Sequence, residues 1–169
     1  MQSENVLDCS NQQERLEQIG WIVGFVDGEG CFTISLHKNP TTSLGWQIMP
    51  EFILSQGEKS LNVLRMVKDY FNCGRISVNY RHDNHREDLY RFCVKSQKEL
   101  RDKIIPFFKE YQLKTSKKND FEIFSEVLEL MSKKEHLSQK GIKKIIKLIE
   151  KMNTKKKRQF VLESPETTR

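Results

Sequence analysis

Ile22-Val23-Gly24-Phe25-Val26-Asp27-Gly28-Glu29-Gly30 combines an apolar run with two carboxylates that are set between glycines. The apolar spacing predicts a helix over residues 14–26, which the following glycines end, because glycine readily adopts the backbone of a helix C-terminus. The two carboxylates would then lie at the negative end of the helix dipole, where anions are disfavoured. This arrangement predicts a compensating cation, and a divalent metal is the strongest candidate. A buried helix with a glycine cap and two surface acids is the alternative.

The same segment resembles the LAGLIDADG motif, which gives its name to a family of homing endonucleases. It keeps the apolar start, the glycine at the third position (Gly24), the acid at the sixth (Asp27) and the final acid and glycine. Glu29 stands at the eighth position, where the motif more usually has aspartate, and the change keeps the charge. The resemblance implies that Glu29 binds the catalytic metal, with Gly28 at the same metal site. Asp27 is the weaker candidate for a ligand.

The length and charge are those of one ordinary domain with an anionic partner. The chain has 169 residues, a net charge of +6 and a pI near 9.1. Its positive charge is concentrated towards the end: residues 133–158 contain 11 lysines and arginines and two acids, whereas residues 1–132 contain 17 and 19. Such clustering favours contact with phosphates, although a lysine-rich helix that is merely solvated has the same composition.

Cysteine usage and hydropathy predict an intracellular protein. The four cysteines, at positions 9, 31, 73 and 93, form no metal-binding pattern with the four histidines, which predicts free thiols in a reducing compartment. No secretory segment and no apolar run near 18 residues is present, so we expect no membrane partner. The chain has no alanine and 20 lysines against nine arginines, a composition typical of an AT-rich genome. We therefore expect an organelle, chloroplast or mitochondrion, or a bacterial cytoplasm.

The remaining sequence predicts an α+β fold. Alternating apolar residues predict strands, and apolar residues three and four apart predict helices. We expect a flexible N-terminus over residues 1–13, one domain over 14–153 and a basic and polar tail over 154–169. The expected order is α-β-β-α-β-β-α with extra C-terminal helices. Its elements are a helix at 14–26, strands at 31–38 and 46–56, a helix at 60–71, a hairpin of 75–80 and 88–95, and helices near 97–110, 119–132 and 139–152.

Helices in this order cover one face of a four-stranded antiparallel sheet. The family that the motif resembles uses the same order, with a saddle-shaped sheet over DNA, and this resemblance extends over about residues 14–132. The other face would carry polar and basic side chains, which can pair with base edges in the major groove. A face that is only wet is the alternative. The expected DNA-reading residues are Thr33, Ser35, His37, Asn39, Gln47, Glu51, Arg75, Ser77, Asn79, Arg81 and Arg91.

Lysines of the last predicted helix are expected to contact DNA phosphates. Lys140 and Lys143, together with Lys144 and Lys147, would add affinity that is salt-sensitive and independent of sequence. An exposed helix face that binds nothing is the alternative. Double-stranded DNA is therefore the expected partner.

Hydrolysis of a phosphodiester needs an activated water and neutralisation of charge, and a divalent metal ion supplies both. Mg²⁺ or Mn²⁺ is the expected cofactor, and Ca²⁺ is expected to bind without supporting cleavage. The resemblance implies a lysine near the scissile phosphate, after Pro106-Phe107-Phe108. Lys114 is our choice, and its role would be to stabilise charge on the phosphate or to orient a water. Lys117 and Lys118 are the alternatives.

The resemblance also implies a polar residue that orients solvent at the end of the second strand. Gln56 occupies this position, and an ordinary strand-end glutamine is the alternative. A basic residue is expected a few positions later, where this chain has Ser60. Lys59 and Lys98 are the candidates to replace it.

One carboxylate is a sparse site for Mg²⁺, which prefers six ligands, and the sequence holds no second copy of the motif. Two identical chains that pack through Gly20 and Gly24 would bring two Glu29 carboxylates together, because small residues four apart let helix backbones approach closely. Such a homodimer predicts a near-palindromic target of about 20 base pairs. The expected interface residues are Gly20, Trp21, Val23, Gly24 and Asp27.

The leading hypothesis is therefore a homodimeric, site-specific double-strand DNA endonuclease of the homing type. The alternative is an RNA maturase that binds intron RNA, or a DNA-binding regulator, on the same scaffold without cleavage, because a fold does not fix a function. The retained Glu29 and Lys114 favour the enzyme. A basic structural protein that binds polyanions without specificity is the third hypothesis.

Overall fold

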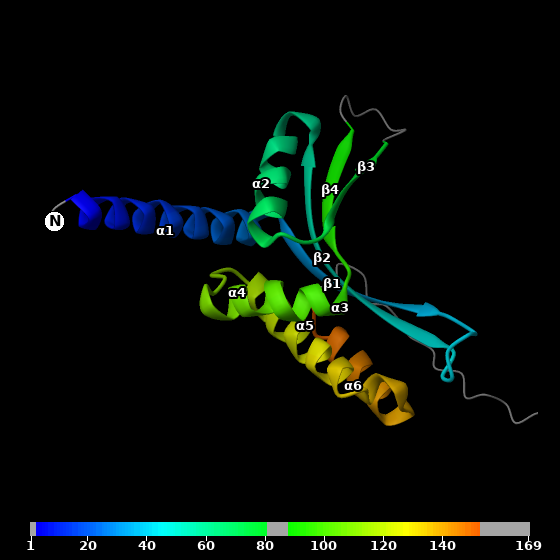
Figure 1. Cartoon of the computed structure of the whole chain (residues 1–169). Helices are drawn as coiled ribbons and strands as arrows, with labels where there is room; N and C mark the ends of the chain where they lie inside the picture. Colours follow the sequence, from blue (N-terminus) through cyan, green and yellow to red (C-terminus); the bar gives the residue numbers. More distant parts are fainter. Residues whose placement is uncertain (1–2, 81–87, 153–169) are drawn as a thin grey trace, which may run out of the picture.

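The computed structural model describes residues 3–80 and 88–152, in which helices cover one face of a four-stranded antiparallel sheet (Figure 1). The predicted α+β class and order of elements are confirmed. The elements are α1 (Ser3–Glu29), β1 (Gly30–Lys38), β2 (Trp46–Gly57), η1 (Glu58–Ser60), α2 (Leu61–Phe71), β3 (Arg75–Asn79), β4 (Leu89–Val94), α3 (Gln97–Glu99), η2 (Leu100–Ile104), α4 (Ile105–Glu110), α5 (Lys117–Ser132), η3 (Glu135–Leu137) and α6 (Gln139–Ile149).

The strands lie in the order β1-β2-β4-β3, and all neighbours are antiparallel. The β1–β2 hairpin has Gly30 opposite Leu54, and β4 pairs with the second half of β2. Successive side chains of a strand point to opposite faces. Apolar residues such as Phe32, Phe52 and Phe92 therefore face the helices, and all three are buried.

Phenylalanines fill the space between the sheet and the helices. The ring of Phe32 stacks on Phe52 with centroids 5.0 Å apart, and it lies 5.6 Å from Phe108 of α4 and 5.3 Å from Phe124 of α5. Aromatic pairs at these distances add stabilisation to the burial of apolar area. Ile22 of α1 is fully buried in the same cluster, so the motif helix is anchored to the core close to its C-terminal end.

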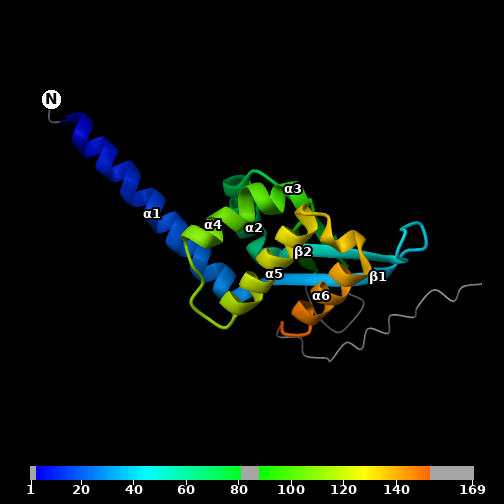
Figure 2. The same cartoon turned by 90° about the horizontal axis from the view of Figure 1, so that it is seen from below.

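Helix α1 is longer than predicted at both ends. It begins at Ser3 rather than near residue 14, so the expected flexible segment over residues 1–13 is helical from Ser3 onwards. Residues 11–18 are rich in good helix formers, and Gln13 donates a hydrogen bond to Glu17 one turn later. All eight of these side chains are exposed, and the N-terminal half of α1 extends away from the sheet and the other helices (Figures 1 and 2).

The single helix predicted over residues 97–110 is divided into three pieces. Helix α3 ends at Glu99, the π-helical turn η2 follows, and α4 starts at Ile105. Pro106 lies in the first turn of α4, and because proline lacks an N–H it cannot continue a regular helical bonding pattern. Arg81 and the predicted tail over residues 154–169 lie outside the described residues.

Candidate functional site

The acidic end of α1 meets the segment that connects α4 to α5. Asp27 accepts hydrogen bonds from the backbone N–H of Lys114 (2.7 Å) and from both the backbone N–H (3.2 Å) and the hydroxyl (2.8 Å) of Thr115. Burial alone would raise the pKa of the Asp27 carboxyl, but these hydrogen bonds and the charge of Lys117 lower its pKa below the ordinary value. Asp27 thus fastens the connecting segment to the motif helix.

Of the three candidate lysines, Lys117 is the one whose ammonium group reaches the motif. Its Nζ donates to the carbonyl oxygens of Val26 (3.1 Å) and Gly28 (3.0 Å). The last carbonyls of a helix have no partner within the helix, and this ammonium satisfies two of them at the end of α1. Lys114 binds Asp27 through its backbone only, and its side chain is exposed.

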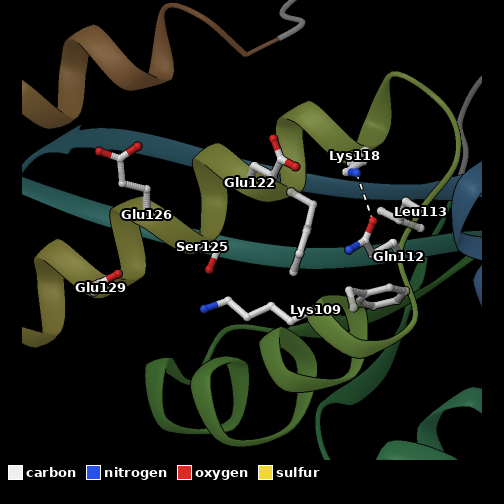
Figure 3. A pocket seen from close by; sticks show the side chains of 10 residues that line it. Lys109, Gln112, Leu113, Lys118, Glu122, Ser125, Glu126 and Glu129 are labelled. Carbon is white, nitrogen blue, oxygen red and sulfur yellow. Dashed lines mark hydrogen bonds between the residues drawn. The ribbon is translucent and has the colours of Figure 1, made fainter.

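Lys118 points to the opposite side, into a cavity of about 300 Å³ between α4 and α5 (Figure 3). Its Nζ donates to Oε1 of Gln112 at 3.0 Å, and Lys109 and Glu122 line the same cavity. The cavity lies among the helices that cover the inner face of the sheet. Lys118 is therefore directed away from the motif end.

The motif end offers an incomplete set of metal ligands. Glu29 is the last residue of α1 and is exposed, and the Gly28 carbonyl accepts the Lys117 ammonium. Within the part of the chain that the structure describes, no group of three or more His, Cys, Asp or Glu side chains is placed to hold a metal ion. A carboxylate and a carbonyl oxygen are ligands that Mg²⁺ accepts. They fit a metal if oxygen ligands beyond those of residues 3–80 and 88–152 join them.

Gln56 lies at the same end of the sheet as Glu29. Gly30, the first residue of β1, pairs with Leu54. Glu29, which precedes Gly30, and Gln56, which follows Leu54, therefore lie at the same end of the two strands. Gln56 is half-buried and pairs with Tyr90 at the start of β4. Lys59 follows in η1 and is exposed, whereas Lys98 lies in α3 beyond the far end of β4. Position thus favours Lys59 over Lys98 as the basic neighbour of Gln56.

The polar residues predicted to read DNA lie on the sheet face opposite the helices. The register places Thr33 opposite Glu51, His37 opposite Gln47 and Ser77 opposite Arg91. Strand alternation gives these residues the same side of the sheet. Four further predicted members are described by the structure. Ser35 lies on β1, Asn39 lies in the turn between β1 and β2, and Arg75 and Asn79 lie on β3.

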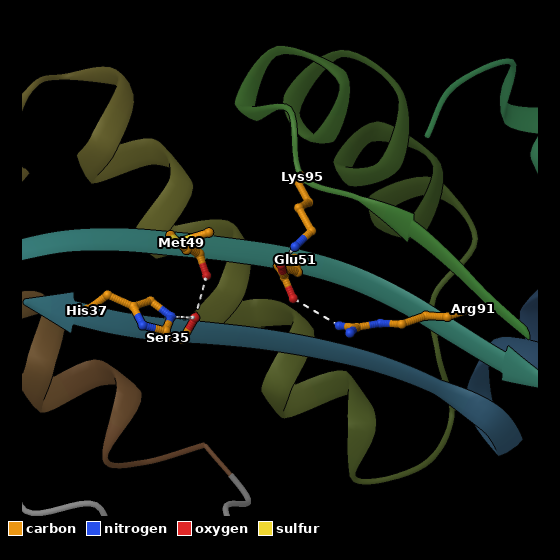
Figure 4. A network of polar contacts seen from close by, with 6 residues as sticks. All are labelled: Ser35, His37, Met49, Glu51, Arg91 and Lys95. Carbon is orange, nitrogen blue, oxygen red and sulfur yellow. Dashed lines mark hydrogen bonds and ion pairs between the residues drawn. The ribbon is translucent and has the colours of Figure 1, made fainter. Parts of the chain in front are cut away.

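Two groups of hydrogen bonds order part of this face. Near the hairpin end, Asn39 Nδ2 donates to Gln47 Oε1 at 2.9 Å. His37 Nε2 and Ser35 Oγ lie 3.1 Å apart, and the Ser35 hydroxyl donates to the Met49 carbonyl at 3.4 Å (Figure 4). These side chains partly satisfy one another and still present edges to solvent.

The second group is centred on Glu51. Glu51 points to the outer face, yet it is buried and forms ion pairs with Arg91 (3.0 Å) and with Lys95. Ile53 of the same face is also buried. Lys95 is absent from the residues that we selected for DNA reading, although strand alternation places it on this face, four residues after Arg91.

The glycine-containing face of α1 is open. A Cβ atom at Gly20 or Gly24 would meet no heavy atom within 4 Å. The Trp21 side chain is 41% exposed, and its ring stacks on that of Phe25 with centroids 5.0 Å apart. Leu16, which the sequence reasoning did not select, is exposed one turn earlier. The predicted interface residues are thus available for a partner, except that Val23 is half-buried and Asp27 is engaged by its own chain.

The basic side chains of α6 form an exposed stripe. Lys140 and Lys143 are exposed, as are Lys144 and Lys147, while the isoleucines between them are buried in the core, where α6 packs on α5. Spacings of three and four place the lysines on one helix face. No helix in residues 3–80 or 88–152 is long and apolar enough to cross a membrane.

Comparisons with known proteins agree with this geometry. Residues 22–128 match the family model described as LAGLIDADG endonuclease. The chain is 35% identical, over 128 residues, to the probable intron-encoded endonuclease 2 of Neurospora crassa, and the match covers 75% of this chain and 27% of that protein. The match covers only about a quarter of this relative and of the probable intron-encoded endonuclease 3 of the same organism, 27% and 24% of their lengths.

Solved structures share the same arrangement. The homing endonuclease I-TnaI superposes with a TM-score of 0.73 at 37% identity, covering 82% of this chain and 89% of that one. I-SmaMI bound to an uncleaved DNA target in the presence of calcium ions gives a TM-score of 0.72 at 35% identity, covering 78% of this chain and 43% of that one. With the family model matching more than half of its residues, the chain belongs to the LAGLIDADG endonuclease family.

Proposed function

We propose that this chain is one motif-bearing unit of a site-specific double-strand DNA endonuclease that uses a divalent metal ion. The observation that carries this proposal is the exposed Glu29 carboxylate at the edge of a polar and basic sheet face, one residue after the Gly28 carbonyl that accepts the Lys117 ammonium. An acid and a cation at the margin of a nucleic-acid surface are the groups that phosphodiester hydrolysis requires. The endonuclease names of the relatives support the same reaction.

In this proposal Glu29 holds the metal, together with the Gly28 carbonyl. When bound, Mg²⁺ or Mn²⁺ would supply charge neutralisation and the activation of a water molecule. Ca²⁺ would occupy the same site without cleavage, in keeping with the calcium-containing, uncleaved complex of I-SmaMI. In the structure the same carbonyl accepts the Lys117 ammonium, so Lys117 and a metal ion would compete for it.

We assign to Lys117 the role that the sequence reasoning gave to Lys114. Its ammonium lies within hydrogen-bond distance of the motif backbone, so a short movement brings it to a phosphate placed over Glu29. A cation at that point stabilises the charge that develops on the phosphate. Gln56, at the same end of the sheet, would orient solvent, and Lys114 remains the alternative lysine.

A second unit completes the site. The open Gly20 and Gly24 face of α1 allows close approach of another motif helix, which would bring a second carboxylate and, with DNA phosphates, fill the metal coordination. A second copy of this chain is the unit that we propose. Two copies related by a two-fold axis would bind a near-palindromic site.

The outer sheet face would read that site. Arg75 and Arg91 are suited to guanine, and Gln47 and Asn79 to adenine, in the major groove. The lysine stripe of α6 would add contacts to phosphates whose strength falls with salt. Intron RNA remains a partner of the alternative function only.

The experiment compares the wild-type chain with Glu29→Gln and with the control Glu126→Gln on α5. Bound duplexes are selected from a randomised DNA library in Ca²⁺, and Ca²⁺ is then exchanged for Mg²⁺ before the ends are sequenced. Glu29→Gln should keep binding and lose cleavage by a factor of about 10² or more, whereas the control should cut like the wild type.

Cleavage by Glu29→Gln at the wild-type rate would remove Glu29 from the metal site. A defined bound site that the wild type leaves intact would favour a DNA-binding regulator on the same scaffold. Selection of no DNA consensus would move the proposal to an RNA maturase.

A further inference from the structure

Glu51 is an acid in the centre of the basic sheet face. Its side chain is 12% exposed, and both carboxylate oxygens are engaged: Oε2 by Arg91 at 3.0 Å and Oε1 by Lys95. Its cross-strand neighbour on β1 is Thr33, so the carboxylate lies within the row of polar side chains that faces outwards. A surface that only attracted DNA would gain nothing from an anion at this place, because that anion repels phosphates.

The ion pair forces Arg91 to lie along the sheet. Arg91 pairs with Ser55, four residues further along β2 than Glu51, so its side chain must extend across the intervening row to reach the carboxylate (Figure 4). That row contains Ile53 and Cys93, which are only 9% and 4% exposed although strand alternation points them outwards. Because Arg91 extends across this row to Glu51, its aliphatic part can cover them, as long basic side chains often do.

The Arg91 guanidinium is consequently restricted. Its Nη2 is bound to Glu51, and its Nε is enclosed without a hydrogen-bond partner, which leaves the outer edge of the group for other contacts. Lys95 is drawn to the same carboxylate from the end of β4. Two cations of this face are thereby held in place and share one compensating charge.

We propose that Glu51 is a positioning residue for sequence recognition: it holds Arg91 and Lys95 in fixed places, so that they contact bases of one target instead of phosphates of any DNA. An oriented arginine can form a pair of hydrogen bonds with guanine. A mobile arginine or lysine finds a phosphate more readily, and such contacts carry no sequence information. This inference rests on the proposed function, since it requires that the sheet face binds DNA.

The test uses the consensus duplex selected with the wild-type chain and a scrambled duplex. Affinities for both are measured in Ca²⁺ at several salt concentrations for the wild type, Glu51→Gln and Glu129→Gln. Glu129 is the matched control because its ion pair with Lys133 is exposed on α5, away from the sheet face. Glu51→Gln should bind scrambled DNA more tightly, with a salt dependence steeper by about one or two phosphate contacts.

Glu51→Gln should also lose discrimination. The ratio of specific to non-specific affinity should fall about tenfold or more, at a few adjacent base pairs only, while Glu129→Gln keeps the wild-type ratio. A parallel loss of both affinities, or no change in either, would overturn the inference and leave Glu51 a purely structural residue. Failure of the wild type to select any consensus would instead overturn the proposed function.

Two further variants extend the test, and the first keeps it decisive even if Glu51→Gln does not fold. Arg91→Lys keeps the charge but lacks the planar fork, so it should lower the base preference while the salt dependence stays that of the wild type. Combining Glu51→Gln with Arg91→Ala measures their coupling: the effect of Glu51→Gln on specificity should shrink once Arg91 is gone. An undiminished effect, or an unchanged base preference in Arg91→Lys, would show that Glu51 does not act through Arg91.

Discussion

Asp27 shows how one carboxylate can support a site without belonging to it. The motif places two acids two residues apart, and the structure separates their roles: Glu29 is exposed, whereas Asp27 binds the backbone of Lys114 and Thr115. The segment so fastened leads directly into Lys117. Asp27 therefore sets the position of the ammonium group that we place at the phosphate.

Asp27→Asn should lower the free energy of unfolding at pH 7 by about 1 kcal/mol, because a neutral amide oxygen replaces a charged acceptor that is partly exposed to solvent. The pKa of Asp27 is lowered in the folded chain. The stability that it contributes is thus present above the unfolded pKa of about 3.9 and is lost as pH falls through the folded value.

Urea unfolding at pH 7 and near pH 3 measures this difference, with the exposed Asp102→Asn as the control. The gap between wild type and Asp27→Asn should narrow at the lower pH. A gap that is the same at both pH values would show that the charge of Asp27 contributes nothing.

Lys117 and Lys114 give opposite expectations for catalysis. Lys117→Ala should reduce the cleavage rate by a factor of about 10² to 10³, as expected when a group that stabilises transition-state charge is removed. Lys114→Ala should have a much smaller effect, because its bonded atom is the backbone nitrogen, which alanine retains. Single-turnover cleavage in Mg²⁺ and binding in Ca²⁺ are measured for both variants, and a larger loss in Lys114→Ala would restore the original choice of lysine.

In helix α1, the proposed dimer requires glycine at position 24, whereas the isolated chain does not. Gly24 is exposed, and an added Cβ meets nothing within 4 Å, so the isolated chain has room for a larger residue. Leucine also favours a helix by about 0.5–1 kcal/mol over glycine. Only a second helix packed on this face requires the glycine.

Gly24→Leu should therefore raise the stability of the monomer slightly and weaken the dimer at least tenfold. Sedimentation equilibrium over a range of concentrations measures the association, and Gln18→Leu, on a different face of α1, is the control. Equal association of wild type and Gly24→Leu would place the interface elsewhere.

The elements could be predicted from the sequence where local pattern determines them. The strand expected over 31–38 corresponds to β1 (Gly30–Lys38), and the one expected over 46–56 corresponds to β2 (Trp46–Gly57). These predictions are accurate because the alternation of apolar and polar residues is a local property. The end of α1 at Glu29 could not be predicted in this way, since Lys117, a residue distant in sequence, donates a hydrogen bond to the Gly28 carbonyl there. The same contact separates Lys117 from Lys114, which sequence spacing alone left open.

At the scale of the whole molecule, the sequence predicts which residues lie on the outer sheet face. It does not predict which of them are buried or form ion pairs. Alternation correctly assigned Glu51 and Arg91 to the outer face. The burial of Glu51 depends on cations from another strand, and no local pattern describes such a pairing. The exposure of the glycine-containing face of α1 could not be predicted either, because it depends on which elements of the folded chain pack nearby.

The length of the sheet and the α1 interface together determine how much DNA the assembled protein should cover. Strand β2 has 12 residues, and at about 3.3 Å per residue the sheet spans about 40 Å, slightly more than one turn of the duplex. Two copies joined through α1 should protect about 20 base pairs with two-fold symmetry. Hydroxyl-radical footprinting in Ca²⁺ measures this for the wild type and for Gly24→Leu, which should protect about half as much because it retains the sheet face but not the partner. An asymmetric wild-type footprint with one chain bound per duplex would mean that a unit of different sequence supplies the second half of the site.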